Sequence, residues 1–150
     1  MEANSLSPEE QQERFDLITH KLKFVQQKPL VAVLRALSPP EFNAGLLEAA
    51  ILHAGGALFS EVKTADTLPE ILLVAVPELS VGAAMAQLPD ALAQTELASF
   101  PAVTDKKIYI LDTDRMNSAS ELTRTEAIAE IIQPKQFIFG YEGDFWLRFG

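Results

Sequence analysis

Asp112 and Asp114 are the two carboxylates whose spacing best suits chemistry. They form an Asp-Thr-Asp run directly after an apolar segment, where paired carboxylates could hold a hard cation or orient a substrate. The same residue types after a strand more often form turns and cap helices. His20 and His53 have no histidine or carboxylate at the spacing of a helical metal motif, so we expect them to be structural.

Other enzyme motifs are missing from the sequence. There is no GxSxG elbow, and Gly55-Gly56 follows a helical segment, whereas a glycine-rich phosphate loop must begin one. The chain has no cysteine, which excludes thiol catalysis and zinc-cysteine sites. We therefore predict that the protein is not an enzyme and uses no cofactor.

Composition limits the class of protein further. The 150 residues are 48% hydrophobic, enough for one ordinary domain, and the net charge of -9 opposes a nucleic-acid partner. No run approaches the roughly 18 apolar residues of a membrane span, which predicts no membrane insertion. The first thirty residues show no secretory signal, so the sequence predicts a soluble, cytoplasmic protein.

Helical and strand-like segments alternate along the chain. Ser7-Pro8 is a helix start, and apolar residues then recur at helical spacing. Alternation of this kind predicts a mainly parallel, three-layer α/β/α sandwich preceded by an N-terminal helix. The expected helices are 7–27, 46–54, 80–98 as two short helices or as one with a sharp bend at 88–90, and 119–133; the expected strands are 30–37, 58–62, 71–76 and 107–111.

One domain, 1–150, is expected, with an N-terminal helix in 1–28, an α/β core in 29–134 and an aromatic tail in 135–150. The tail differs in composition from everything before it. It is either a final strand or arm packed on its own domain, or a patch that docks on a second copy or another protein. The candidate interface residues are Phe137, Phe139, Tyr141, Phe145, Trp146 and Phe149.

Ligands of open parallel sheets sit beyond the carboxyl ends of the strands. Three predicted strands are followed at this edge by the segments 38–43, 77–80 and 113–118. The polar and aromatic side chains of these segments could converge on a small molecule. Each of these residues could instead be a cap, a turn or a solvated charge. The candidate ligand-binding residues are Arg35, Ser38, Pro40, Phe42, Asn43, Glu78, Arg115 and Asn117.

The order of these segments resembles a known family. PLVAVLRALSPPEF, a helix ending in HAGG, ILLVAVPELS, KKIYILDTD and a helix running into IIQPKQF are similar to the C-terminal lobe of the TroA-like, helical-backbone binding proteins for cobalamin and iron siderophores in ABC importers. The resemblance covers about residues 12 to 140. It implies that the first helix is the end of the helix joining two lobes, and that the loop from Ser38 to Phe42 and the loop from Pro77 to Leu79 face a ligand cleft.

Two hypotheses follow from this resemblance and the tail. The first is a stand-alone single lobe that binds a corrinoid, haem or ferric siderophore without catalysis, with two copies facing each other as a homo-oligomer. The second is a structural or protein-interaction domain that kept the fold, lost ligand binding and associates through its aromatic tail.

Overall fold

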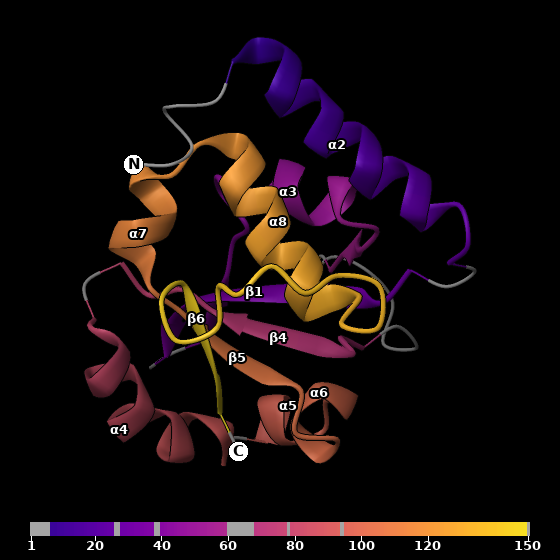
Figure 1. The fold of residues 1–150 in the computed structure, drawn as a ribbon. Coiled ribbons are helices and arrows are strands. Elements are labelled where there is room, and N and C mark those ends of the chain that lie inside the picture. The colour runs from indigo at the N-terminus through magenta and orange to yellow at the C-terminus, as the bar shows by residue number, and fades with distance from the viewer. Residues whose placement is uncertain are drawn as a thin grey trace.

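The computed structural model describes residues 7–25, 28–37, 40–59, 68–77, 79–93 and 95–149. Helices and strands alternate through most of this length (Figure 1). In chain order the elements are α2 (Pro8–Leu22), β1 (Leu30–Leu37), β2 (Pro40–Phe42), α3 (Leu47–His53), β3 (Ala57–Leu58), β4 (Ile71–Val74), α4 (Val81–Leu92), α5 (Thr95–Ala98), α6 (Pro101–Thr104), β5 (Ile108–Leu111), α7 (Thr113–Ser118), α8 (Glu121–Ile132) and β6 (Trp146–Phe149).

The strands form one sheet in the order β2-β1-β4-β5-β6, and β3 pairs with the start of β1. β1, β4 and β5 run parallel, so their carboxyl ends lie at one edge. β2 and β6 add antiparallel partners at the two sides. This confirms the predicted mixed α/β fold with a mainly parallel sheet.

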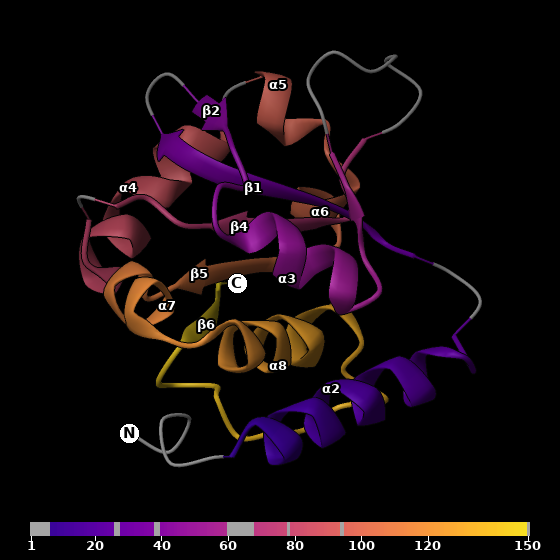
Figure 2. The same ribbon diagram turned by 90° about the horizontal axis from the view of Figure 1, so that it is seen from above.

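Helices cover both faces of the sheet. α2, α3 and α8 lie on one face, and α4, α5 and α6 on the other (Figure 1). Figure 2 shows α3 and α8 next to the strands and α2 outside α8. Successive side chains of a strand point to opposite faces of the sheet, and this produces two cores. Val31 and Val33 of β1 join the cluster under α3 and α8, while Ala32 and Leu34 join the cluster on the opposite face.

Ends of the first two helices follow from local sequence. Ser7 caps α2 in a capping box with Glu10, as the sequence predicts, but the helix ends at Leu22, short of the predicted residue 27. α3 is closed by Gly55, whose φ of +89° favours glycine. A Cβ there would also lie 2.7 Å from Cδ2 of Leu22, so the glycine permits the close approach of α2.

Several segments differ from prediction. The alternative of two helices divided at 88–90 was wrong, because α4 continues through Pro89 to Leu92 and α5 begins only at Thr95. Its Leu88 and Ala91 are buried in the core, and this packing outweighs the hydrogen bond that a proline removes. β2 and the short helices α6 and α7 were not predicted, and residues 60–62 of the expected second strand lie outside the described residues.

The C-terminal tail ends in β6, which pairs with β5 over its whole length. This confirms the prediction that the tail forms a final strand packed on its own domain. Among the described residues, no helix is both long and apolar enough to cross a membrane.

Candidate functional site

A cavity of about 520 Å³ lies where α7, the start of α8, α2 and the C-terminal tail meet. α7 directly follows the carboxyl end of β5, so the cavity borders the edge at which ligands of parallel sheets bind. Its lining combines basic, hydroxyl and aromatic side chains. These residues are Arg14, Arg115, Ser118, Ala119, Thr123, Phe139, Gly140, Tyr141, Asp144 and Phe145.

α7 places Arg115 at this cavity. Asp112 is the N-cap of the helix, and its Oδ1 accepts a hydrogen bond of 3.1 Å from the backbone N–H of Arg115. Its other oxygen, Oδ2, lies 3.6 Å from Nε of the same arginine, whose side chain is 57% exposed. The first carboxylate of the Asp-Thr-Asp run is thus a helix cap, and the guanidinium beside it reaches solvent.

Glu130 of α8 holds the tail against the fold. Its buried carboxylate accepts hydrogen bonds from the backbone N–H groups of Phe139, Gly140 and Tyr141. It also accepts one of 3.1 Å from the indole Nε1 of Trp146. These hydrogen bonds offset the cost of burying the Glu130 carboxylate. They also fix the chain segment that forms one wall of the cavity.

Glu126, one turn earlier on α8, joins α2 to the same wall. Both of its oxygens accept from the guanidinium of Arg14, and the Tyr141 hydroxyl donates to it at 2.8 Å. Burial and the hydrogen bond with Glu126 raise the pKa of Tyr141 to about 12. Burial by itself lowers the pKa of Arg14, but the hydrogen bond and charge of Glu126 outweigh it and raise that pKa.

The hydroxyls at the cavity are engaged in local structure. Ser118 Oγ donates to the backbone oxygen of Asp114 at 2.9 Å, and Thr123 Oγ1 accepts from the Ser120 hydroxyl at 3.1 Å. Neither has a histidine as its hydrogen-bond partner in these contacts. In the part of the chain that the structure describes, no three His, Asp or Glu side chains are grouped to hold a metal ion.

Arg35 and Asn43 both lie beside Gly45, at a second position on the same edge of the sheet. Asn43 Oδ1 accepts from the backbone N–H of Gly45 at 2.9 Å. Gly45 has a φ of +52°, and a Cβ there would lie 2.7 Å from NH1 of Arg35. Nε of Arg35 is buried without a hydrogen-bond partner. β4 lies between β1 and β5 in the sheet, so the end of β1 is two strand spacings, or about 10 Å, from β5, the strand that leads to α7.

The remaining predicted ligand residues are placed differently. Phe42 packs against the rings of Phe59 and Phe100, at centroid distances of 5.4 and 5.9 Å, on the α4 and α6 face. Asn117 is exposed on α7. Ser38 and Glu78 lie outside the described residues, as does the side chain of Pro40.

The predicted interface aromatics divide into three groups. Phe137 and Trp146 are buried in the core, with 1% and 8% exposure. Phe149 is half-buried against the α4 to α6 face. The other three, Phe139, Tyr141 and Phe145, are half-buried and line the cavity, so they lie with Arg115, which was predicted for a ligand rather than for an interface.

Sequence reasoning missed Arg14, Thr123 and Asp144 as cavity residues, whereas Ser118 lies in the predicted segment 113–118. Arg14 is separated from its partner Glu126 by 112 positions, and a single sequence gives no signal for such a contact. Asp144 lies in the tail, where no local pattern distinguishes it from the neighbouring acid Glu142.

Solved structures share this fold, although comparison with known family models finds no match, and a search of curated proteins finds none either. The chain is similar to the TroA-like periplasmic binding protein FepB of Veillonella parvula, with 14% identity, a TM-score of 0.68, and coverage of 93% of this chain and 54% of that one. An ABC transporter substrate-binding protein of Listeria monocytogenes EGD-e has 13% identity, a TM-score of 0.67 and coverages of 82% and 54%.

The IsdE protein of S. aureus, solved in complex with heme, has 12% identity, a TM-score of 0.64 and coverages of 81% and 54%. This chain therefore spans about half the length of each of these three proteins. Its fold matches that half, which is consistent with a single lobe of a periplasmic binding protein.

These comparisons also correct the predicted location. The cytoplasmic prediction is contradicted by the similar structures. FepB is described as a periplasmic binding protein, and the Listeria protein and IsdE share its fold. It was wrong because it rested on a missing pattern in the first thirty residues, and a missing pattern carries little information.

Proposed function

We propose that the chain is a non-enzymatic, small-molecule-binding module whose ligand occupies the cavity beside α7. The observation that carries this proposal is the convergence of Arg115 with three aromatic rings at the carboxyl edge of the sheet. The fold shared with binding proteins of ABC transporters supports it. The hydroxyls there are bound within the protein, which supports a binding role rather than an enzymatic one.

The lining favours an anionic ligand with a flat or apolar part. The exposed guanidinium of Arg115 offers N–H donors that suit a carboxylate, and aromatic rings suit a flat surface. The cavity volume of about 520 Å³ falls in the usual range for ligand sites. Haem fits this chemistry, and a corrinoid or a ferric siderophore is the other candidate class.

We further propose that residues 1–150 act as one binding unit in which the helix of 1–28, the core of 29–134 and the tail of 135–150 are inseparable. α8 supports this, because Glu126 bonds to α2 and Glu130 bonds to the tail. A cavity at the surface of one lobe leaves a side for a second copy, and we propose a homo-oligomer that covers it.

Isothermal titration with haem, cobalamin and a ferric siderophore tests the ligand. Arg115→Met should weaken binding of the preferred ligand about tenfold or more, since a hydrogen bond to a charged group contributes about 1.5 to 3 kcal/mol. Asn117→Ala, on the same helix but exposed, is the matched control and should bind as the native chain does. Absence of binding to all three compounds would remove the proposed ligand classes.

A second candidate is an interaction domain that associates through its tail, favoured by the partial exposure of Phe139, Tyr141, Phe145 and Phe149. Light scattering coupled to gel filtration distinguishes the two candidates when it is run with and without ligand. Association that is the same with and without ligand, and that is lost in Phe145→Ser, would support the interaction domain. A mass that changes only on ligand addition would support the binding module.

A further inference from the structure

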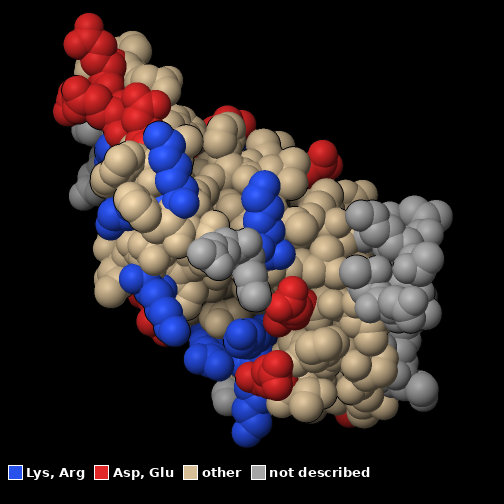
Figure 3. All heavy atoms as spheres, turned by 90° about the vertical axis from the view of Figure 1, so that its right-hand side faces the viewer, with Lys and Arg blue, Asp and Glu red and all other residues tan. Residues whose placement is uncertain are grey.

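Basic side chains gather at the amino edge of the sheet, the edge opposite the cavity. The parallel strands begin there, so the residues just before β1 and β5 share this edge, together with the ends of α2, α8 and β6. Figure 3 shows Lys and Arg side chains concentrated on this side of the molecule. We call this surface the basic edge; its residues are Lys21, Lys23, Lys28, Lys106, Lys107, Lys135 and Arg148.

Direct contacts join the elements of the basic edge. Nζ of Lys21 donates to the backbone oxygen of Gln136 at 3.1 Å and lies 5.6 Å from the ring centre of Phe137. The guanidinium of Arg148 donates twice to the backbone oxygen of Lys106, at 3.2 and 3.1 Å. The end of α2 is thus fixed beside the tail, and the end of β6 beside the start of β5.

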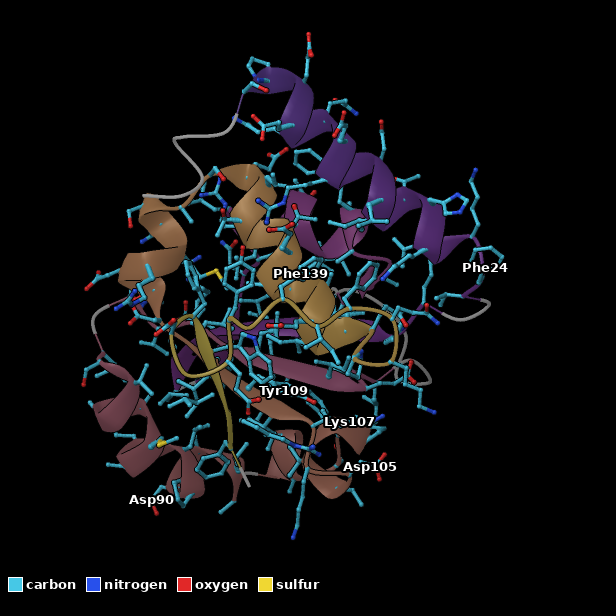
Figure 4. The ribbon with its side chains drawn as sticks, in the orientation of Figure 1. Phe24, Asp90, Asp105, Lys107, Tyr109 and Phe139 are labelled. Atoms are coloured by element: carbon cyan, nitrogen blue, oxygen red, sulfur yellow. The ribbon has the colours of Figure 1, made fainter. Side chains whose placement is uncertain are left out.

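Two strongly exposed apolar side chains lie close in the chain to residues of the basic edge. Phe24 is 70% exposed and Ile138 is 88% exposed, the largest values among the exposed large hydrophobic residues described. Each lies within three positions of the contact between Lys21 and the chain at Gln136 and Phe137. Figure 4 shows Phe24 at the end of α2, directed away from the sheet. Their exposure is unfavourable in water unless another surface covers them.

We propose that the basic edge docks peripherally on an anionic lipid bilayer. Lysines around protruding apolar side chains form an interfacial binding surface, in which the chains enter the headgroup region and the ammonium groups meet lipid phosphates. Glu70 and Asp105 also lie at this edge, but the cations outnumber the described carboxylates. This interaction is separate from ligand binding at the cavity.

The overall charge of -9 does not prevent this docking. Screening limits exposed charges to a range of about 8 Å in physiological salt, so the surface nearest the bilayer decides the interaction. The acidic start of α2, with Glu9 and Glu10 in its first turn, lies at the opposite end of that helix from Lys21 and Lys23. Repulsion of that end would orient the basic edge toward the lipid.

Co-sedimentation with vesicles tests the proposal. The full chain should bind vesicles of phosphatidylcholine and phosphatidylglycerol in equal parts, not vesicles of phosphatidylcholine alone, and added salt should weaken the binding. Each lysine near an anionic surface contributes about 1 kcal/mol, so K23Q/K135Q should weaken partitioning about 25-fold. F24S/I138S should also weaken it, while Leu52→Ser, an exposed apolar residue of α3, is the matched control.

Several outcomes would overturn the proposal. These are equal binding to both kinds of vesicle, no binding to either, or native-like binding by K23Q/K135Q with its circular dichroism unchanged. Capture by poly-glutamate without capture by vesicles would instead indicate an acidic protein as the partner. Arg115→Met, which is designed to impair the cavity, should bind vesicles as the native chain does, so failure of one proposal leaves the other testable.

Discussion

Two sets of charged groups in this molecule differ in their partners. One is the pair of carboxylates on α8 that bond α2 and the C-terminal tail, and the other is the pair of arginines at the carboxyl edge of the sheet. Glu126 and Glu130 are buried and accept hydrogen bonds from α2 and from the tail. Arg115 is 57% exposed and has a 3.6 Å contact with Asp112, and Nε of Arg35 is buried without a partner. A group whose bonds are satisfied within the chain stabilises the fold, whereas an incompletely bonded one is available to a ligand.

Glu130→Ala is expected to have the largest effect on this contrast. It would leave three backbone N–H groups and the indole N–H of Trp146 without their acceptor, at a cost of about 3 kcal/mol or more. Urea denaturation measures the free energy of unfolding. Glu121→Ala, at an exposed position of the same helix, is the control and should change it by a few tenths of a kcal/mol. Equal effects of the two variants would contradict the anchoring role.

A double-mutant cycle with Arg14→Met and Glu126→Gln should give the next largest effect. The two side chains share two hydrogen bonds, and Glu126 is only 1% exposed, so we expect a coupling energy of about 1.5 kcal/mol. The free energies of unfolding of the four proteins supply this number. Additive effects would show that the contact between Arg14 and Glu126 does not stabilise the fold.

Tyr141→Phe should be less stable than the native chain below pH 10, and this difference in stability should decrease at alkaline pH. The folded-state pKa of about 12 lies above the ordinary value of about 10, so the neutral phenol stabilises the fold below pH 10 and this stabilisation is lost as the pH rises toward 12. The difference in urea midpoint between the native chain and Tyr141→Phe should therefore shrink over that range. A constant difference would exclude the hydrogen bond to Glu126 as the source.

Substitutions of the two arginines should have the smallest effects on stability. Arg115→Met removes an exposed contact, and we expect a change within about 0.5 kcal/mol. Arg35→Met removes a buried Nε that has no partner while keeping most of the stem, so it should be neutral or stabilising. Thermal unfolding of both variants measures this. A loss comparable to that of Glu130→Ala would mean that the arginines are structural, which would weaken the binding proposal.

Much of the fold was predictable because it depends on local patterns. The helix start at Ser7 and Pro8, the strand 30–37 and the helix end at Gly55 follow from capping, from continuous apolar runs and from a left-handed glycine. α4 was predicted less well. The proline rule describes an isolated helix, and the burial of Leu88 and Ala91 overrides it.

The candidate site was predictable only in part. Arg115 was predicted because it follows a strand, and the carboxyl ends of parallel strands meet at one edge. Phe139, Tyr141 and Phe145 were singled out by composition, but for an interface rather than for a cavity. Arg14 and Asp144 gave no signal, because nothing local relates them to the residues they lie beside.

The sequence by itself determined most of the longer helices and strands, and which edge of the sheet carries the loops, since these depend on neighbours within a few positions. Only the tertiary structure decided that Glu126 and Glu130 bond α2 and the tail to α8, and that Arg115 shares a cavity with the tail's aromatic rings. Such contacts join residues far apart in the chain. They form because buried carboxylates need donors, and in this fold the donors come from segments that the sequence leaves apart.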